Sequence, residues 1–433
     1  MAQTFLNFSV EGTQDRLTAN AGMILFGEYC KAIGLEKQIN THLPLPRSNR
    51  GFSPFEHMMP LILMLHSGGH SLEDIRLIKS DKALRSLLKM ERIATADGIG
   101  KWLGRLGLAG VYGIETINRF LLSRHLKTLD KEPLVLDIDA SVIESHKSTA
   151  AYTYKKVPGF TPMIGHINGG YVIHSEFRSG NIAPADTNLS FVKRCAQQLP
   201  KTQTFSFIRA DSASYQAALF DYCDDNAITY TIGGQLDSSA LNTIREMTQW
   251  EEFSPCESIG ESLHTMINAK NAFRLIVVKK SITPQLPTMQ SLFTEEELQS
   301  YIQEKYHIIA TNADESLSAQ EIVSFYRQRG NESENRIKEL KNGFNLSYLP
   351  SSNFMSNAFY WSIGTLSHNL FILFKQMLEH SKQHHTVATI RHQLYHLAGK
   401  VIVHGRQTIL KINTEFISLF HTIRGRIFSA SLE

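Results

Sequence analysis

Residues 134–234 constrain the fold most, because strand and helix patterns follow one another there in a fixed order. Strand patterns cover LVLDIDAS (134–141), 159–168 and 170–180, and the last two meet at Asn168-Gly169, a typical hairpin turn. Helix, strand, helix and strand patterns then follow at 187–199, 205–212, 214–226 and 228–234. We therefore expect an α/β sheet that begins with a β-hairpin.

This order of elements is that of a ribonuclease H-like sheet, and 433 residues are too many for one ordinary core. We expect an α/β fold: a ribonuclease H-like core at 131–235 and 305–345 with a mostly β insertion at 236–304. Helical patterns predict flanking α-helical regions, an N-terminal domain at 1–130 and a basic C-terminal region at 346–433 with long helices at 358–379 and 386–404.

Two features of the flanking regions suggest contact with DNA, and each has an ordinary alternative. Residues 94–107 suit a helix-turn-helix bearing Lys101 and Arg105, although many helix pairs look alike without binding DNA. From His380 to Glu433 there are seven Lys and Arg but only two acids. Such a surface can follow phosphates, or it can be a helical surface that happens to be basic.

Segments that would direct or hold the chain at a membrane are not evident. The N-terminus has no basic stretch followed by an apolar one, and the most apolar run, MMPLILML at 58–65, is far too short to span a bilayer. We therefore expect a cytoplasmic protein without a membrane partner.

Two aspartates occupy unusual places for charged residues. Asp139 lies within the first strand pattern, and Asp211 ends the pattern FIRADS. Inward-facing carboxylates at strand ends are costly unless they are paired or bind a metal, and Mg²⁺ prefers such hard oxygen ligands. Asp137 shares the sheet face of Asp139, so periodicity leaves open which of them is the ligand. A carboxylate that caps a turn or pairs with Arg209 is the alternative.

A third carboxylate can come from the charged segment FYRQRGNESENRIKELKNGF at 325–344. On a helix, Glu334, Lys338 and Lys341 share one face, whereas Glu332 lies elsewhere. Glu334 could then bind a metal while a lysine one or two turns further on binds a phosphate. Taken alone, the segment is better explained as an exposed helix with a weak Glu–Lys pair.

Together these residues resemble the DDE transposases of bacterial insertion sequences, in the subgroup with a Y-x2-R-x3-E-x6-K signature. The resemblance covers DIDAS around Asp139, RADSASY around Asp211, YRQRGNESENRIKELK from Tyr326, and the helical segment RGFSPFEHMMPLILMLHSGGHSLEDIRLI. One departure is that four residues, not three, separate Arg329 from Glu334, which on an ideal helix turns Arg329 away by about 140°. A π-bulge or break at Gly330-Asn331 would restore Arg329; otherwise its role, or the choice of Glu334 over Glu332, changes.

The resemblance implies two-metal phosphoryl transfer on DNA. Asp139, Asp211 and Glu334 would hold two Mg²⁺, or Mn²⁺ in their place, with Asp139 bridging the ions. Tyr326, Arg329, Lys341 and Lys338 would bind phosphates of the transposon end, and Trp250 would stack on an extruded base unless it is simply a core residue.

Further expectations concern partners and products. The DNA partners would be the terminal inverted repeats and target DNA, bound by a homodimer in a bacterial, nucleoid-associated setting, with hairpin ends as intermediates. The alternatives are a metal-dependent nuclease of the same fold without strand transfer, and a catalytically inactive DNA-binding protein of transposase descent.

Overall fold

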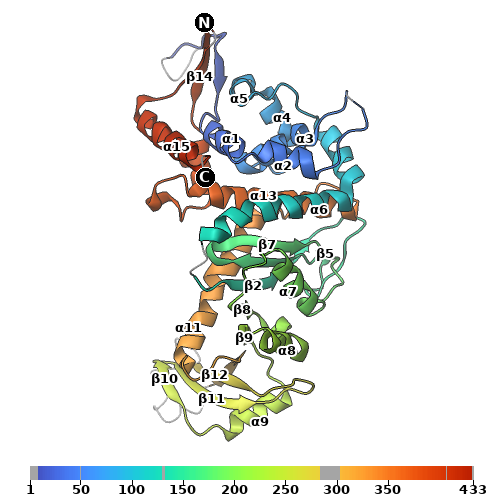
Figure 1. The fold of residues 1–433 in the computed structure, drawn as a ribbon, viewed down its shortest axis with the longest axis vertical. Helices are drawn as coiled ribbons and strands as arrows, with labels where there is room; N and C mark the ends of the chain where they lie inside the picture. Colours follow the sequence, from blue (N-terminus) through green and yellow to red (C-terminus); the bar gives the residue numbers. More distant parts are fainter. Residues whose placement is uncertain (1–7, 49, 129–131, 283–302, 406, 432–433) are drawn as a thin grey trace.

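The computed structural model describes residues 8–48, 50–128, 132–282, 303–405 and 407–431. The molecule is elongated, and its elements lie in three tiers (Figure 1). N-terminal helices and the C-terminal segment form one end, a sheet with its helices occupies the middle, and the residues predicted as an insertion form the other end. No helix within these residues is both long and apolar enough to cross a membrane.

A single nine-stranded sheet runs through the middle and lower tiers. Its order is β10 (Glu251–Ser254), β11 (Glu257–His264), β12 (Phe273–Ile282), β13 (Gln303–Thr311), β9 (Thr229–Gly233), β8 (Phe207–Ala210), β2 (Val135–Ala140), β6 (Met163–Ile167) and β7 (Tyr171–Glu176). Strands β2, β6 and β7 are antiparallel neighbours, and β2, β8 and β9 are parallel. The predicted succession of strands and helices over 134–234 is therefore the one observed.

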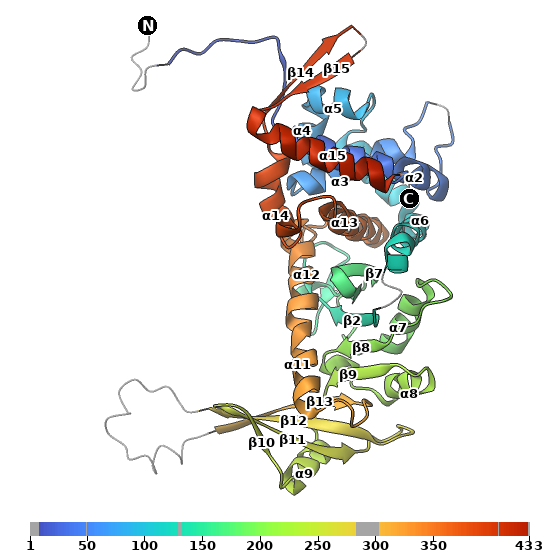
Figure 2. The same cartoon turned by 60° about the vertical axis from the view of Figure 1, so that its left-hand side comes forward.

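The two faces of β2 meet different partners. Leu136 and Ile138 are buried towards helix α7 (Asn188–Gln197). Gly165 on β6 is needed there, because a Cβ atom would lie 2.8 Å from Cys195 Sγ on α7 and 3.3 Å from Leu136. Asp137 and Asp139 alternate with these apolar residues and so face the opposite side. Figure 2 shows α11 (Ala319–Arg329) and α12 (Asn335–Lys338) running past β9, β8 and β2 as one column.

The N-terminal tier consists of short helices packed on two long ones. It contains α1 (Met23–Ala32), α2 (Leu35–His42), α3 (Pro54–Ser67), α4 (Ile75–Ser80), α5 (Lys82–Leu88) and α6 (Ala96–Thr128), and α13 (Phe354–Lys375) packs beneath α6 and α3 (Figure 1). Ser53 starts α3 through a capping box with Glu56. The predicted helix-turn-helix at 94–107 is wrong: one helix begins at Ala96 and bends only at Gly107 (φ 44°). Burial of Ile99, Trp102 and Leu103 keeps it helical through its glycines.

The C-terminal region is only partly helical, which corrects the helix predicted over 386–404. Helix α14 (Val387–Ile390) continues as a π-helical turn to Tyr395, and then β14 (Gly399–His404) and β15 (Gln407–Lys411) form a hairpin before α15 (Ile417–Ala430). β14 pairs with β1 (Arg16–Thr18) from the other end of the chain. The apolar spacing there belongs to a strand rich in β-branched residues, and its partner strand is remote in sequence.

Four of the seven C-terminal cations are engaged within the protein. Lys400 and Arg424 pair with Asp15 and Glu28 at 2.7 and 2.8 Å. Arg391 is buried and donates to His66 O and Leu65 O at the end of α3, while Arg426 donates to Met377 O after α13. The basic composition of this region therefore serves internal contacts to a large extent. The domain boundaries themselves stay a prediction.

The contact between α6 and α13 generates a test of the packing. Gly110→Ala would place a Cβ atom 2.6 Å from the ring of Phe359, whereas at Gly100 in the same helix the nearest atom is Leu72 Cδ1 at 3.8 Å. We expect Gly110→Ala to lower the free energy of unfolding by about 1–3 kcal/mol. Gly100→Ala should raise it by up to about 1 kcal/mol, because alanine favours the helix. Urea unfolding of both variants measures the difference, and equal effects would contradict the packing.

Candidate active site

Asp139 and Asp211 stand side by side at the ends of two parallel strands. The last paired residues of β2 and β8 are Ile138 and Ala210, so the next step in this register aligns Asp139 with Asp211. Neighbouring strands lie roughly 4.8 Å apart, which puts both carboxylates at one edge of the sheet on one face. Asp211 also caps the short helix that follows, accepting from Ala213 N at 3.1 Å.

An arginine on the neighbouring strand distinguishes Asp137 from Asp139. Arg209 donates to both carboxylate oxygens of Asp137, at 2.8 and 2.7 Å, and both side chains are almost fully buried. Its remaining nitrogen donates to Phe325 O on α11 at 2.9 Å. Asp137 is thus a structural residue that holds α11 on the sheet, and Asp139 keeps its carboxylate at the open edge.

The helix that carries the charged segment contains two π-helical turns. After α11, which Ser318 starts with a capping box, the chain forms a π-helix at Gly330–Glu334, α12, and a second π-helix at Glu339–Gly343. A π turn contains an extra residue relative to an α turn, so it absorbs the additional residue between Arg329 and Glu334. Arg329 is directed to the sheet as a result, and its Nη2 lies 3.1 Å from Asp139 Oδ2.

The charges of Asp211 and Glu334 both act on the carboxylate of Asp139. Asp139 is 15% exposed. Burial raises the pKa of Asp139 to about 6, Arg329 opposes this shift, and the charges of Asp211 and Glu334 add to it. Tyr326 belongs to the same group: burial raises the pKa of its hydroxyl, Arg329 lowers it, and Asp211, Asp139 and Glu334 raise it. Glu334 itself is exposed to solvent. The Glu332 side chain lies outside the described residues.

This donor set suits a hard divalent cation. The grouped carboxylates repel one another, and only Arg329 balances Asp139 within the described residues. No three acidic, histidine or cysteine side chains in that part of the chain are close enough to bind one ion together. Mg²⁺ commonly takes one or two protein carboxylates and fills its other positions with water and phosphate, so neighbouring pairs of these acids fit it.

The predicted phosphate ligands lie at different distances from this group. Lys341 Nζ donates to Val142 O at 2.8 Å, just after Asp139 in the chain, and burial lowers its pKa. Lys338 is exposed and forms no ion pair with a described residue. Trp250 is remote, since five strands separate β10, which follows it, from β2. It lies over Gly260, and Lys279 Nζ lies 4.5 Å from its ring centroid.

Two residues beside the acids were not singled out in the sequence. Tyr154 is exposed, and after burial the charges of Asp139 and Asp211 raise the pKa of its hydroxyl. The charge of Lys155 lowers the pKa of Lys341. Both lie in the turn between β4 (Ala151–Tyr152) and β5 (Pro158–Phe160), which form a small sheet with β3 (Ile143–Glu144). The signal in the sequence was the run Tyr-Thr-Tyr-Lys-Lys at 152–156, shortly after Asp139.

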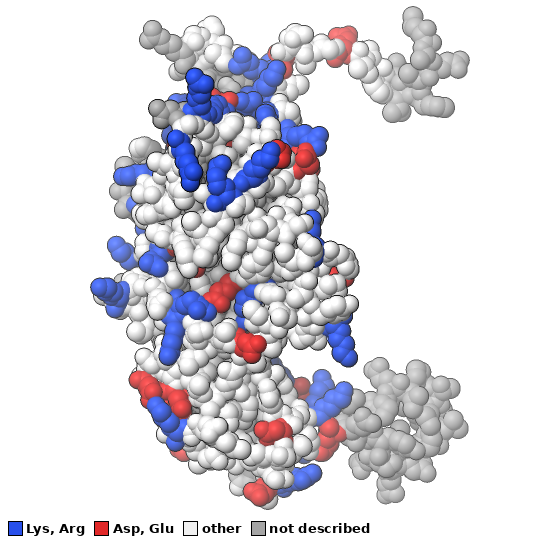
Figure 3. Space-filling model, turned by 90° about the vertical axis from the view of Figure 1, so that its right-hand side faces the viewer, with Lys and Arg blue, Asp and Glu red and all other residues white. Residues whose placement is uncertain are grey.

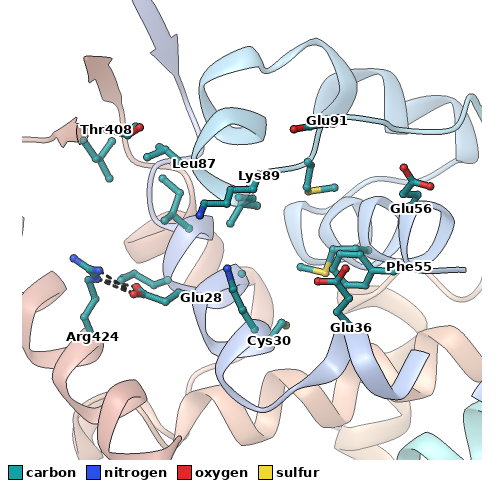
Figure 4. A pocket seen from close by; sticks show the side chains of 18 of the residues that line it. Glu28, Cys30, Glu36, Phe55, Glu56, Leu87, Lys89, Glu91, Thr408 and Arg424 are labelled. Carbon is teal, nitrogen blue, oxygen red and sulfur yellow. Dashed lines mark hydrogen bonds and ion pairs between the residues drawn. The ribbon is translucent and has the colours of Figure 1, made fainter. Parts of the chain in front are cut away.

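One cavity lies away from these residues. It has a volume of about 1160 Å³ and lies between α1, α2 and α3 on one side and β15 and α15 on the other (Figure 4). Its wall mixes acids such as Glu36 and Glu56 with Lys89 and the paired Arg424 (Figure 4). Figure 3 shows Lys and Arg gathered over the upper part of one face, and blue and red intermixed lower down.

The comparison with known families agrees with this geometry. The family described as transposase DDE domain group 1 matches residues 5–430, nearly the whole chain. The protein belongs to this DDE transposase family. Among curated proteins, none is significantly similar to the chain. Members of a DDE transposase family act on DNA by strand cleavage and nucleotidyl transfer and generally use divalent metals.

The pair Asp137–Arg209 generates a stability prediction for this DDE transposase. Asp137→Ala leaves a buried guanidinium without its carboxylate, which typically costs about 3–5 kcal/mol. We expect a loss of that order in the free energy of unfolding, measured by urea titration. Glu321→Ala at the exposed start of α11 is the control and should cost much less, because it removes only the solvent-exposed N3 partner of the capping box. Equal losses would mean that the buried pair does not hold α11 on the sheet.

The raised pKa of Asp139 generates a pH prediction in metal-free buffer. Between pH 4 and 6 the folded protein keeps a proton on Asp139 that the unfolded chain, with an ordinary pKa of about 3.9, releases. The stability that this group contributes is thus complete below pH 4 and is lost as pH rises to about 6. Asp139→Asn removes this dependence, so its stability relative to the unsubstituted protein should rise by on the order of 2–3 kcal/mol over that interval. If the difference in free energy of unfolding between Asp139→Asn and the unsubstituted protein stayed constant across this pH range, the raised pKa of Asp139 would be excluded.

Proposed function

We propose that the protein is the transposase of an insertion sequence, which it cuts and pastes by two-metal phosphoryl transfer at its inverted-repeat ends. The observation that carries this proposal is the shared register of Asp139 and Asp211, with the π turn that brings Arg329 to Asp139 and Glu334 to the rim. The antiparallel β2, β6 and β7 followed by parallel β8 and β9 support a ribonuclease H-like core.

Asp139, Asp211 and Glu334 would hold two Mg²⁺, with Asp139 between the other two acids. When bound, such ions supply an activated water or 3′-hydroxyl and stabilise the leaving oxygen of the phosphodiester. Arg329 compensates Asp139 before the ions bind and is close enough to contact a phosphate afterwards. Tyr326 supports this arrangement, because its hydroxyl packs at Gly233, where a Cβ atom would lie only 2.5 Å away.

Cationic side chains would position the DNA strand without reading bases. Lys341 is held beside the acids by Val142 O, and Lys338 points to solvent one turn earlier in the helix. Contacts of this kind determine the register of a strand on the protein and tolerate movement of its bases between steps. Trp250 would stack on a base extruded at the hairpin end. Because Trp250 lies at the far end of the sheet from Asp139, that end of the sheet would then have to contact the DNA. In a homodimer, the second protomer would supply this contact.

The acids generate the test of the proposed reaction. A duplex carrying the inverted repeats that flank the gene is incubated with Mg²⁺ or Mn²⁺, and the products are resolved on denaturing gels. Asp139→Asn, Asp211→Asn and Glu334→Gln should each lower strand cleavage at least about 100-fold, because even partners of metal ligands are worth 10–100-fold. Glu332→Gln is the matched control and should retain activity.

The products separate the alternatives. Hairpin ends and joined target DNA support the transposase, cleavage without joining supports a metal-dependent nuclease, and binding without cleavage supports an inactive DNA-binding protein. Intact cleavage by Asp139→Asn would overturn the assigned site, and activity lost in Glu332→Gln but kept in Glu334→Gln would transfer the role to Glu332.

A further inference from the structure

The small sheet after β2 brings an aromatic ring to the acids. β3 follows Asp139 by only a few residues, and the chain between β4 and β5 forms a tip of Tyr154, Lys155 and Lys156. Burial raises the pKa of the Tyr154 hydroxyl, and the charges of Asp139 and Asp211 raise it further. Tyr154 nevertheless remains 49% exposed, so part of the residue is open to a ligand.

The tip is held rigidly. Thr153 N and Oγ1 both donate to Val157 O at 2.9 Å, and Lys156 N donates to Thr153 O at 2.9 Å. Lys156 takes a left-handed conformation (φ 59°), which tightens the turn.

The base of the hairpin is equally restrained. A Cβ atom at Gly159 would lie 2.2 Å from Ile143 O, and one at Gly180 would lie 2.3 Å from both Ala151 O and Gly159 O. Close backbone packing of this kind leaves little freedom to move, so the position of Tyr154 is set before any ligand binds.

A positive charge lies over the ring. Lys155 Nζ lies 5.8 Å from the centroid of the Tyr154 ring, and the charge of Lys155 also reaches Lys341. Neither lysine forms an ion pair with a described residue. An open aromatic face beside unpaired lysines is the arrangement with which proteins bind single-stranded nucleic acid, because every base offers a π-face and every nucleotide a phosphate.

We infer that Tyr154 stacks on an unpaired base of the DNA strand next to the bond that is cut, while Lys155 binds the adjoining phosphate. The inference rests on the proposed function and adds a positioning residue to it. Tyr154 would hold the strand end over Asp139 and Asp211 without reading sequence. The ring, not the hydroxyl, makes the contact, so phenylalanine should substitute for it.

The contact is measured on a duplex with a short single-stranded 3′ overhang whose first unpaired base is 2-aminopurine, with Ca²⁺ in place of Mg²⁺ so that the DNA stays uncut. The unsubstituted protein and Tyr154→Phe should quench the fluorescence, and Tyr154→Ala should not. Lys155→Ala should weaken binding of the probe. It should also reduce the slope of the logarithm of the dissociation constant against the logarithm of the salt concentration by about one. With Mg²⁺, Tyr154→Ala should cut the inverted-repeat duplex about tenfold more slowly.

Tyr152→Ala, which removes a 73% exposed ring from the same hairpin, is the matched control and should quench fully. Full quenching by Tyr154→Ala, equal losses in Tyr154→Ala and Tyr152→Ala, or failure of the unsubstituted protein to bind the probe would each overturn the inference. Quenching needs no cleavage. A protein that quenches through Tyr154 but cuts no DNA therefore supports the contact while contradicting the proposed transposition.

Discussion

Two carboxylates on one face of β2 are each balanced by an arginine, and the arrangement of the central tier depends on those two pairs. Asp137 meets Arg209 from the next strand, and Asp139 meets Arg329 from the helix above. Arg209 also binds Phe325 O, so the same guanidinium connects strand, strand and helix. A buried charge without such a partner would cost several kcal/mol, and the helix has to lie where it supplies one.

The two pairs have different consequences because they differ in depth. The inner pair is bidentate and almost completely buried, which makes it a fixed part of the fold. The outer pair lies at the strand ends beside Asp211, where burial and, after it, the like charges of Asp211 and Glu334 raise the pKa of Asp139. One strand thereby supplies an almost fully buried, paired carboxylate and, two residues further on, a partly exposed one.

The helical segment of α11 and α12 departs from α-helical geometry at two places, and each departure changes the direction in which the neighbouring side chains point. One π turn lies between Arg329 and Glu334, and the second contains Lys341. Each adds a residue to a turn and changes which side chains face the sheet. The hairpin with Tyr154 follows β2 in the chain, and the charges of Asp139 and Asp211 act on the Tyr154 hydroxyl.

Much of this could be predicted from the sequence, because local patterns report local structure: the alternation in LVLDIDAS, the Asn168-Gly169 turn and the order of elements over 134–234 correspond to β2, the β6–β7 hairpin and the sheet. Contacts between remote segments could not be predicted. Periodicity left Asp137 and Asp139 equivalent until Arg209 paired with one of them, and the spacing from Arg329 to Glu334 depended on a π turn. The strand at 399–404 needed β1 from the other end of the chain, and the cations of the C-terminal region found carbonyls and carboxylates of other helices. Sequence alone thus determined which segments are strands or helices and where acids stand along them. Tertiary structure decided which acids are neutralised and which stay open, because that depends on charges brought together only when the chain is folded.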